Sequence, residues 1–175
     1  AGSFSAKVTV DGKPTSGGKA RLQANPAGKG GWRTVARKKL PKSGRVVFSH
    51  KVKKNSKFRI AVSKTGTRKA ARSVVVRTKV RAAVRVNSSI VAFTGQPVRL
   101  SGTVLPARKG ITVVRQRLVE GSWTPLGRTR TRSDGSYRFS VTPTVKNGSY
   151  TYRVVSEPFD GYARGYSSPI SFRSR

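Results

Sequence analysis

The chain contains one pattern of residues twice, and this repeat limits the folds that it can adopt. In each copy a Trp is followed twelve residues later by a Gly and sixteen residues later by a Phe. The landmarks are Trp32, Gly44 and Phe48 in the first copy and Trp123, Gly135 and Phe139 in the second. An apolar residue precedes each Trp by ten positions, and an Asn-containing basic turn and an alternating run follow each Phe. Five landmarks in the same order predict two copies of one folding unit, in residues 1–79 and 80–175.

Short runs rich in Val, Thr and aromatic residues make up each copy, and Gly, Pro, Asn and Ser separate them. Examples are residues 98–104, 111–119, 136–141 and 150–156. Apolar and polar residues alternate within these runs, which is typical of half-buried strands, and no segment has helical periodicity. The sequence therefore predicts an all-β protein of two tandem β-sandwich domains.

Several motifs of the second copy resemble the Ig-like repeats that are common in secreted actinobacterial proteins. They are "SGTV" at 101–104, "GSW" at 121–123, "SDGSYRF" at 133–139 and "YRV" at 152–154. The first copy matches more loosely, because Ser43-Gly44 replaces the Asp-Gly turn and "SGTV" has no clean counterpart. The resemblance implies Ig-like sandwiches and an extracellular, non-catalytic module, and it identifies no ligand.

The two copies differ in the length of chain ahead of their shared landmarks. The second has room for an early strand around Ser88–Phe93, whereas the first has only "FSAKVTV" ahead of its Leu22 strand. One interpretation is that the first copy lacks its first strand and has an edge that another chain can pair with. The other is that strand numbers vary and the first copy's own loops cover this edge.

The junction between the copies, residues 74–86, contains neither Gly nor Pro. Its apolar residues alternate with basic ones, as in a strand, and flexible linkers are instead rich in Gly and Ser. We expect a short strand-like linker that joins the copies as a rigid, rod-like pair.

Charge is the most extreme property of the composition. The chain has 38 Lys and Arg against 5 Asp and Glu, a formal net charge of +33, whereas a small soluble domain typically carries about 2–8 charges in magnitude. Edge lysines deter aggregation and exposed strand faces are often charged, but such surfaces usually mix both signs because like charges opposite one another destabilise a sheet. The near absence of acids favours an acidic partner.

Basic residues on alternate positions of a strand share one face and form a cationic row. Such rows are expected at Arg128-Arg130-Arg132 and Arg77-Lys79-Arg81, with a shorter one at Arg115-Arg117. The full set of candidate polyanion-binding residues is Arg37, Lys38, Lys39, Lys53, Lys54, Arg77, Lys79, Arg81, Arg85, Arg115, Arg117, Arg128, Arg130 and Arg132. Phe159, Tyr162 and Tyr166 are candidates for stacking on bases, or alternatively for core and turn positions.

The acidic residues and the single histidine argue against catalysis. Asp11, Asp134, Asp160 and Glu120 each precede a Gly, which is typical of hairpin turns, and only Glu157 lies outside such a pair. His50 has no evident acid and nucleophile to complete a triad. With no Cys and no phosphate-binding glycine loop, we expect no metal, no cofactor and no enzymatic activity.

The leading hypothesis is an exported, non-enzymatic protein that binds a polyanion, above all the phosphate backbone of nucleic acid without sequence specificity. It includes self-assembly into an extracellular fibre or matrix. The alternatives are a cell-surface adhesion or wall-binding module that recognises teichoic acid or acidic polysaccharide, and an intracellular nucleic-acid scaffold. The start "AGSFSA" is typical of a chain processed after export, so we expect an extracellular or cell-surface location. No apolar run is long enough for a membrane span.

Overall fold

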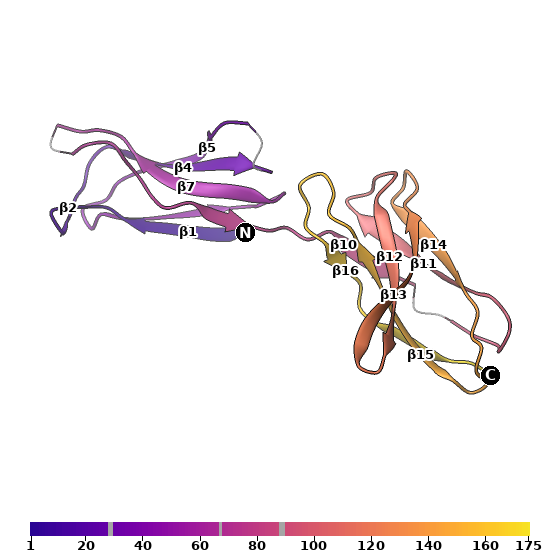
Figure 1. Cartoon of the computed structure of the whole chain (residues 1–175). Helices are drawn as coiled ribbons and strands as arrows, with labels where there is room; N and C mark the ends of the chain where they lie inside the picture. Colours follow the sequence, from indigo (N-terminus) through magenta and orange to yellow (C-terminus); the bar gives the residue numbers. More distant parts are fainter. Residues whose placement is uncertain (28–29, 67, 88–89) are drawn as a thin grey trace. The chain divides into compact units, whose positions relative to one another are not determined.

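The protein folds into two compact all-β units, Ala1–Val80 and Arg81–Arg175 (Figure 1). The computed structural model describes residues 1–27, 30–66, 68–87 and 90–175. Every regular element in these ranges is a strand, as the alternating sequence pattern predicts. Among them is no helix long and apolar enough to cross a membrane. The unit boundary lies between residues 80 and 81, next to the boundary expected between 79 and 80.

Unit 1 is a sandwich of a two-stranded and a five-stranded sheet. The small sheet pairs β1 (Gly2–Lys7) with β6 (Arg45–His50). The large sheet has the order β5 (Arg33–Lys39), β4 (Lys19–Pro26), β7 (Ser56–Val62), β8 (Ala71–Arg72), and β9 (Val76–Thr78) also pairs with β7. A short hairpin of β2 (Thr9–Val10) and β3 (Lys13–Pro14) completes the unit. Leu22, Phe48 and Phe58 lie fully buried between the sheets.

Unit 2 has the same two layers with one more strand in the smaller sheet. That sheet has the order β10 (Ala83–Val86), β11 (Val98–Leu105), β14 (Ser136–Val141). The larger sheet has the order β13 (Ser122–Arg130), β12 (Thr112–Val119), β15 (Ser149–Ser156), β16 (Gly165–Tyr166), and β17 (Ile170–Arg173) also pairs with β15. The four strands expected from the sequence are confirmed as β11, β12, β14 and β15, and each end lies within one residue of its expected position.

The repeated Gly lies in the same turn of both units, and the backbone there explains the residue type. Gly44 and Gly135 adopt positive φ angles of 67° and 78°. Their carbonyls accept hydrogen bonds from the N–H groups of Val8 and Val104, at 2.8 and 2.9 Å. A Cβ atom at either glycine would lie 2.5 Å from a backbone carbonyl oxygen. Both the φ angle and the close approach therefore require glycine.

The junction between the units is less regular than a continuous strand. Val74 and Val76 are 84% and 49% exposed, whereas Ala82 and Val84 are buried. The apolar residues from 74 to 86 therefore do not form one buried face. Of the early strand expected around Ser88–Phe93, Ser88 and Ser89 lie outside the described residues, and Ala92 forms an isolated bridge with Ser174. The strand that pairs with the free edge of β11 is β10, which comes earlier in the chain.

Replacing Gly135 by Ala will destabilise unit 2 more than the same change at Gly121. Both positions have positive φ, but only Gly135 would place its Cβ against backbone, since Gly121 has nothing within 4 Å of that position. We expect G121A to cost about 1–2 kcal/mol for the left-handed backbone, and G135A about 1–3 kcal/mol more for the steric conflict. Amide hydrogen exchange of β11 and β14 measures the opening free energy. Equal losses in the two variants would show that the close approach does not matter.

Candidate polyanion-binding surface

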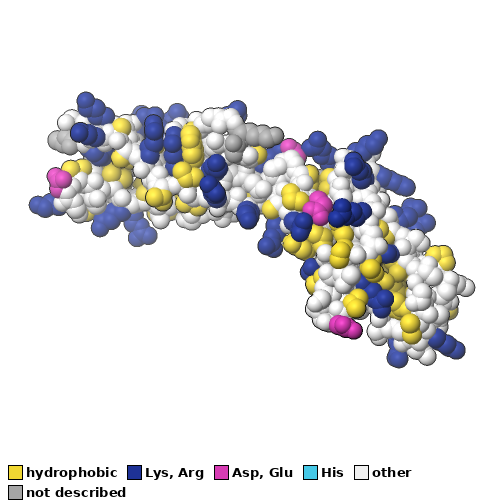
Figure 2. Space-filling view, viewed as in Figure 1, with side chains coloured by type: hydrophobic (Ala, Val, Ile, Leu, Met, Phe, Trp, Pro, Cys, Tyr) yellow, Lys and Arg dark blue, Asp and Glu magenta, His cyan; other side chains and the backbone are white. Residues whose placement is uncertain are grey.

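The outer face of the five-stranded sheet in unit 1 carries basic side chains on each of its strands. Alternate residues of a strand point to opposite faces. In β4 the buried residues are Ala20, Leu22 and Ala24, so Lys19, Arg21 and Gln23 point outward. The same alternation in β7 places Lys57, Arg59 and Ala61 on the outer face. Figure 2 shows Lys and Arg side chains spread over the visible faces of both units, with few acids among them.

The strand register places like charges directly opposite one another on this face. Across the sheet Lys19 pairs with Lys39, Arg21 with Arg37 and Lys57 with Arg77. Residues 1–80 hold 22 Lys and Arg against a single acid, Asp11, which lies at the β2–β3 turn. Like charges directly opposite destabilise a sheet, so this face lowers the stability of unit 1.

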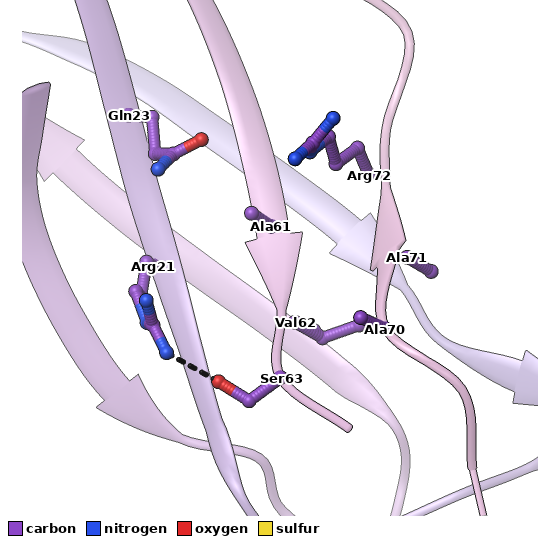
Figure 3. A pocket seen from close by; sticks show the side chains of 8 residues that line it. All are labelled: Arg21, Gln23, Ala61, Val62, Ser63, Ala70, Ala71 and Arg72. Atoms are coloured by element: carbon purple, nitrogen blue, oxygen red, sulfur yellow. Dashed lines mark hydrogen bonds between the residues drawn. The ribbon is translucent and has the colours of Figure 1, made fainter. Parts of the chain in front are cut away.

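A groove of about 590 Å³ opens on the same face (Figure 3). Arg21 and Gln23 of β4 line one side, Arg72 of β8 lies on the other, and Ala61 of β7 lies between them. The short side chain of Ala61 leaves space above the sheet. The Arg21 guanidinium donates a hydrogen bond to the Ser63 hydroxyl at the end of the groove. The groove therefore presents two guanidinium groups together with amide and hydroxyl groups, a set suited to an oxyanion.

A Trp–Arg–Gln cluster lies beside the groove and recurs in unit 2. The Arg59 guanidinium lies 4.1 Å from the centroid of the Trp32 ring, and its Nε donates to Gln23 Oε1 at 2.8 Å. In unit 2 the corresponding distances are 4.3 Å for Arg153 and Trp123 and 2.7 Å for Arg153 and Gln116. In both units the pairing register shifts immediately before the Gln. Because the cluster is present in both units, we assign it to the fold.

Arg59 also contributes to the charge of the outer face. Desolvation, together with the neighbouring Arg72, lowers the pKa of Arg59 from its usual value.

The sequence repeat identified both Trp residues, but it did not identify Gln23 and Gln116. Each Gln lies directly opposite an Arg on the neighbouring strand. This pairing depends on the strand register, which the sequence repeat does not give.

Unit 2 has an aromatic side chain at the position where Arg72 borders the groove of unit 1. Ser73 and Ser167 make the same pair of hydrogen bonds to β7 and β15, so the residues before them, Arg72 and Tyr166, are equivalent. By the same register Val155 of unit 2 corresponds to Ala61. The Tyr166 ring lies 5.1 Å from the Arg153 guanidinium and 5.8 Å from that of Arg81. An aromatic ring therefore occupies in unit 2 the position that Arg72 has in unit 1.

The row expected at Arg128-Arg130-Arg132 is only partly formed. Arg128 and Arg130 lie exposed on the outer face of edge strand β13, opposite Val114 and Thr112. Thr131 is buried, and its hydroxyl donates to the Arg108 carbonyl. Arg132 then turns away, and its carbonyl accepts the N–H of Gly135 in a tight turn.

The side chain of Arg132 contributes to a different cluster, on the smaller sheet of unit 2. It lines a cavity of about 240 Å³ together with Arg99 of β11 and Arg138 of β14. Neither of these two arginines was singled out from the sequence. Their juxtaposition depends on the pairing of β11 with β14, in which Ser101 lies opposite Arg138 and Arg99 opposite Ser140.

The shorter row expected at Arg115-Arg117 differs from a free cationic surface. Both residues are half-buried, and their side chains lie over aromatic rings. Arg115 is 5.6 Å from the Tyr152 ring centroid and donates to the Ser140 carbonyl at 2.6 Å. Arg117 is 4.4 Å from the Tyr150 ring centroid. Arg115 and Arg117 follow Val113 at alternate positions of β12, so their side chains point to the same inward side of the strand. They therefore cover the end of the core.

The other basic candidates lie in varied surroundings. Lys38 faces the sandwich edge, with its ammonium group 5.9 Å from the Phe48 ring centroid. The row expected at Arg77-Lys79-Arg81 crosses the boundary between the units. Lys54 is half-buried. The exposed candidates are Arg37, Lys38, Lys39, Lys53, Arg77, Lys79, Arg81, Arg85, Arg128, Arg130 and Arg132.

Two of the three stacking candidates are packed against the core. Phe159 and Tyr162 pair with each other, with ring centroids 5.3 Å apart, and both pack on the hydrophobic core of unit 2. Tyr166 is 43% exposed and has guanidinium groups near its ring, as described above.

The described part of the chain contains no group of three or more His, Asp or Glu side chains that could hold a metal. The His50 ring packs edge-on against Phe58, 5.8 Å away.

No known family model matches the chain, and no curated protein matches it either. Solved structures with a similar fold include a tetra-tandem repeat from the extending region of a large adhesion protein, with 17% identity and a TM-score of 0.47. That match covers 99% of this chain, which spans about half (49%) of the adhesion protein chain.

Two chicken proteins are also similar, again over 99% of this chain. The interferon gamma receptor alpha chain has 10% identity and a TM-score of 0.46, with 96% of that chain covered. The FN1–FN3 domains of CNTN1 have 13% identity and a TM-score of 0.32, with 60% covered. At these scores the similarities identify neither ligand nor partner.

Replacing Arg37 by Glu will stabilise unit 1. The change converts a repulsive pair with Arg21 into an attractive one across β4 and β5. We expect the free energy of unfolding to rise by about 0.5–1.5 kcal/mol, with a larger gain at low salt because the pair is near the surface. Denaturant titration at two salt concentrations measures it. R37Q should fall between wild type and R37E; a less stable R37E would show that Arg37 supports the fold.

Proposed function

We propose that the chain is a non-enzymatic, extracellular or cell-surface β-sandwich protein that binds a polyanion through the outer face of the large sheet in unit 1. The observation that carries the proposal is the set of three directly opposed like-charge pairs on that face, Lys19–Lys39, Arg21–Arg37 and Lys57–Arg77. Such pairs destabilise the free protein. A polyanion that lies across them replaces this repulsion with attraction.

The arrangement favours an extended polyanion over a small anion. Neighbouring strands are about 4.8 Å apart and alternate residues of a strand about 6.7 Å apart, so the outer face is a nearly regular array of positive groups. A linear chain of phosphates can contact several of these groups at once and release its condensed counterions. The groove between Arg21 and Arg72 adds a place where one oxyanion can accept hydrogen bonds from two guanidinium groups.

The proposed ligand is the phosphate backbone of nucleic acid, bound without sequence specificity. An array of charges on a sheet contacts phosphates and does not reach base edges. The aromatic residues favour backbone contact over base stacking, because Phe159 and Tyr162 pack on the core and guanidinium groups lie over the Trp32 and Trp123 rings. The extracellular location rests on the resemblance of the sequence motifs to secreted Ig-like repeats.

Removing three arginines of this face will weaken DNA binding and flatten its salt dependence. We expect the triple variant R21Q/R37Q/R72Q to bind double-stranded DNA less tightly, with the slope of log K against log salt smaller by about 2–3. The measurement is fluorescence anisotropy with a labelled duplex over a salt series.

A matched control is K13Q/K42Q/R45Q, which removes the same charge from exposed residues of unit 1 outside this sheet. It should change affinity much less than the first variant. Equal effects of the two triple variants would show that only the net charge matters and would contradict the assigned face. Failure of the wild-type protein to bind any polyanion at about 50 mM salt would contradict the proposed function.

Teichoic acid and a carboxylate polysaccharide, hyaluronate, are parallel ligands in the same assay. Nucleic acid as the ligand predicts tighter binding to DNA than to either of them. If teichoic acid binds best, the phosphodiester chemistry holds but the ligand is a wall polymer. If hyaluronate binds as tightly as DNA, phosphate recognition by the guanidinium pair is excluded.

A further inference from the structure

The β1 edge of the small sheet in unit 1 has no strand partner within the described residues, although the equivalent edge of unit 2 has one. Strand β1 pairs with β6 only, whereas its counterpart β11 pairs with β14 on one side and with β10 on the other. The equivalence rests on register, since Phe4 lies opposite Phe48 as Leu100 lies opposite Phe139. Unit 2 therefore shows what a completed sheet of this kind contains.

Backbone hydrogen-bonding groups point outward along this edge of β1. In a strand the N–H and C=O groups of alternate residues point to opposite sides. Val8 and Val104 donate toward the β6 and β14 side, through Gly44 and Gly135. In unit 2 the carbonyl of Ser101 accepts from Asn87 on the other side. By the same alternation Ser3, Ser5 and Lys7 direct their backbone groups away from β6.

An apolar groove of about 280 Å³ lies next to this edge, between β1 and the large sheet. Phe4, Leu22, Phe58, Ile60 and Val76 contribute its apolar lining. The counterpart of Val76 in unit 2 is Ile170, because Val76 lies opposite Phe58 as Ile170 lies opposite Tyr152. Val76 is 49% exposed and Ile170 is 8% exposed.

In unit 2, residues of and beside β10 cover the corresponding region. Ala82 and Val84 are buried in the core that contains Ile170, and Val86 and Ile90 pack against the same core. Ala82, Val84 and Val86 are two residues apart, so they lie on the inward face of the chain at β10. An occupant of the groove in unit 1 therefore needs small or medium aliphatic side chains on alternate residues.

We propose that the free edge of β1 and its groove form a strand-acceptor site. Its occupant is an extended polypeptide segment from outside these 175 residues, with aliphatic residues at alternate positions, which pairs antiparallel to β1. The surrounding unit is strongly basic, so acidic or neutral residues suit the intervening positions. The site lies on the small sheet, and it does not depend on the proposed polyanion surface of the large sheet.

The occupant cannot follow the path of β10 along its whole length. At Gly102 of β11 an added Cβ would lie 1.9 Å from the Arg85 carbonyl oxygen, and β1 has Ala6 at the equivalent position. Tyr137, whose hydroxyl donates to the Arg85 carbonyl at 2.7 Å, is replaced by Val46. The occupant must therefore stay farther from β1 at Ala6, and its pairing is concentrated at Ser3 and Ser5, beside the groove.

The test adds a peptide to the full chain. The probe is a capped peptide of residues 82–91 with Arg85→Glu, which keeps the aliphatic pattern and removes a like charge. The control peptide carries Val84→Asp and Val86→Asp in addition, so it is more acidic but cannot fill the groove. We expect the probe to slow amide exchange of Ser3 and Ser5 by at least about tenfold, as new backbone hydrogen bonds form, and to shift the methyl resonances of Val76.

Protection by the control peptide equal to that by the probe would mean that charge alone drives binding, and it would overturn the proposal. So would the absence of protection by the probe at saturating concentration. The chain variant S5P removes an outward N–H but leaves the β1–β6 ladder in place. In this variant the probe should no longer protect the Ser3 amide, while the β6 amides stay protected.

Two further measurements distinguish the strand-acceptor site from the polyanion surface and from a dimer interface. The variant R21Q/R37Q/R72Q changes only the polyanion surface, so it should bind the probe peptide as tightly as wild type. The two proposals can therefore fail independently of each other. Sedimentation of the chain alone tests a second copy as the occupant. A concentration-dependent dimer that the probe peptide dissociates would assign the groove to a second copy and overturn the occupant proposed here.

Discussion

The alternation of side chains along each strand is the constraint on which the rest of this structure depends. In β7 every second residue from Ser56 to Val62 is buried, and the residues between them point outward. Burial of Phe58, Ile60 and Val62 between the sheets supplies the hydrophobic stabilisation of unit 1. The same geometry directs Lys57 and Arg59 to the opposite face. A chain with few acids that folds in this way necessarily concentrates positive charge on its outer sheet faces.

The two units use one skeleton and differ in what their outer faces carry. The turn glycine, the inter-sheet Phe and the Trp–Arg–Gln cluster occur in both. Where unit 1 has Ala61 and Arg72, unit 2 has Val155 and Tyr166. Small changes at equivalent positions therefore convert an open basic groove into a surface covered by an aromatic ring. This difference makes unit 1 the stronger candidate for polyanion binding, which the charge count of the whole chain does not indicate.

Much of the fold could be predicted from the sequence, because strand formation depends on local alternation and on turn residues. The strands β11, β12, β14 and β15 follow directly from such patterns. The candidate site was harder, since its key contacts join residues that are distant in sequence. The opposition of Arg21 and Arg37 depends on the register of β4 with β5, and that of Lys57 and Arg77 on the register of β7 with β9. Neither register can be predicted from a local sequence pattern.

The arginine rows show why period two alone is insufficient. The spacing of Arg115 and Arg117 is that of an exposed row, yet both cover aromatic rings at the end of the core. A guanidinium group can stack on an aromatic ring and keep part of its surface in water, so basic residues can occupy inward positions that the pattern alone assigns to apolar side chains. Arg132 leaves its row because Thr131 is buried and a turn follows, and the spacing of the arginines contains no sign of that turn.

The free side of β1 differs in composition from the edge strands of the two large sheets, β5 and β13. Proteins commonly protect exposed edges with charged residues or proline. Edge strand β5 has Arg33, Arg37, Lys38 and Lys39, and β13 has Pro125, Arg128 and Arg130. The outward positions of β1 beside the groove are Ser3 and Ser5 instead. In so basic a chain, an edge bordered by serines and an apolar groove lacks the protection that β5 and β13 have, as expected for an edge that is covered when the protein functions.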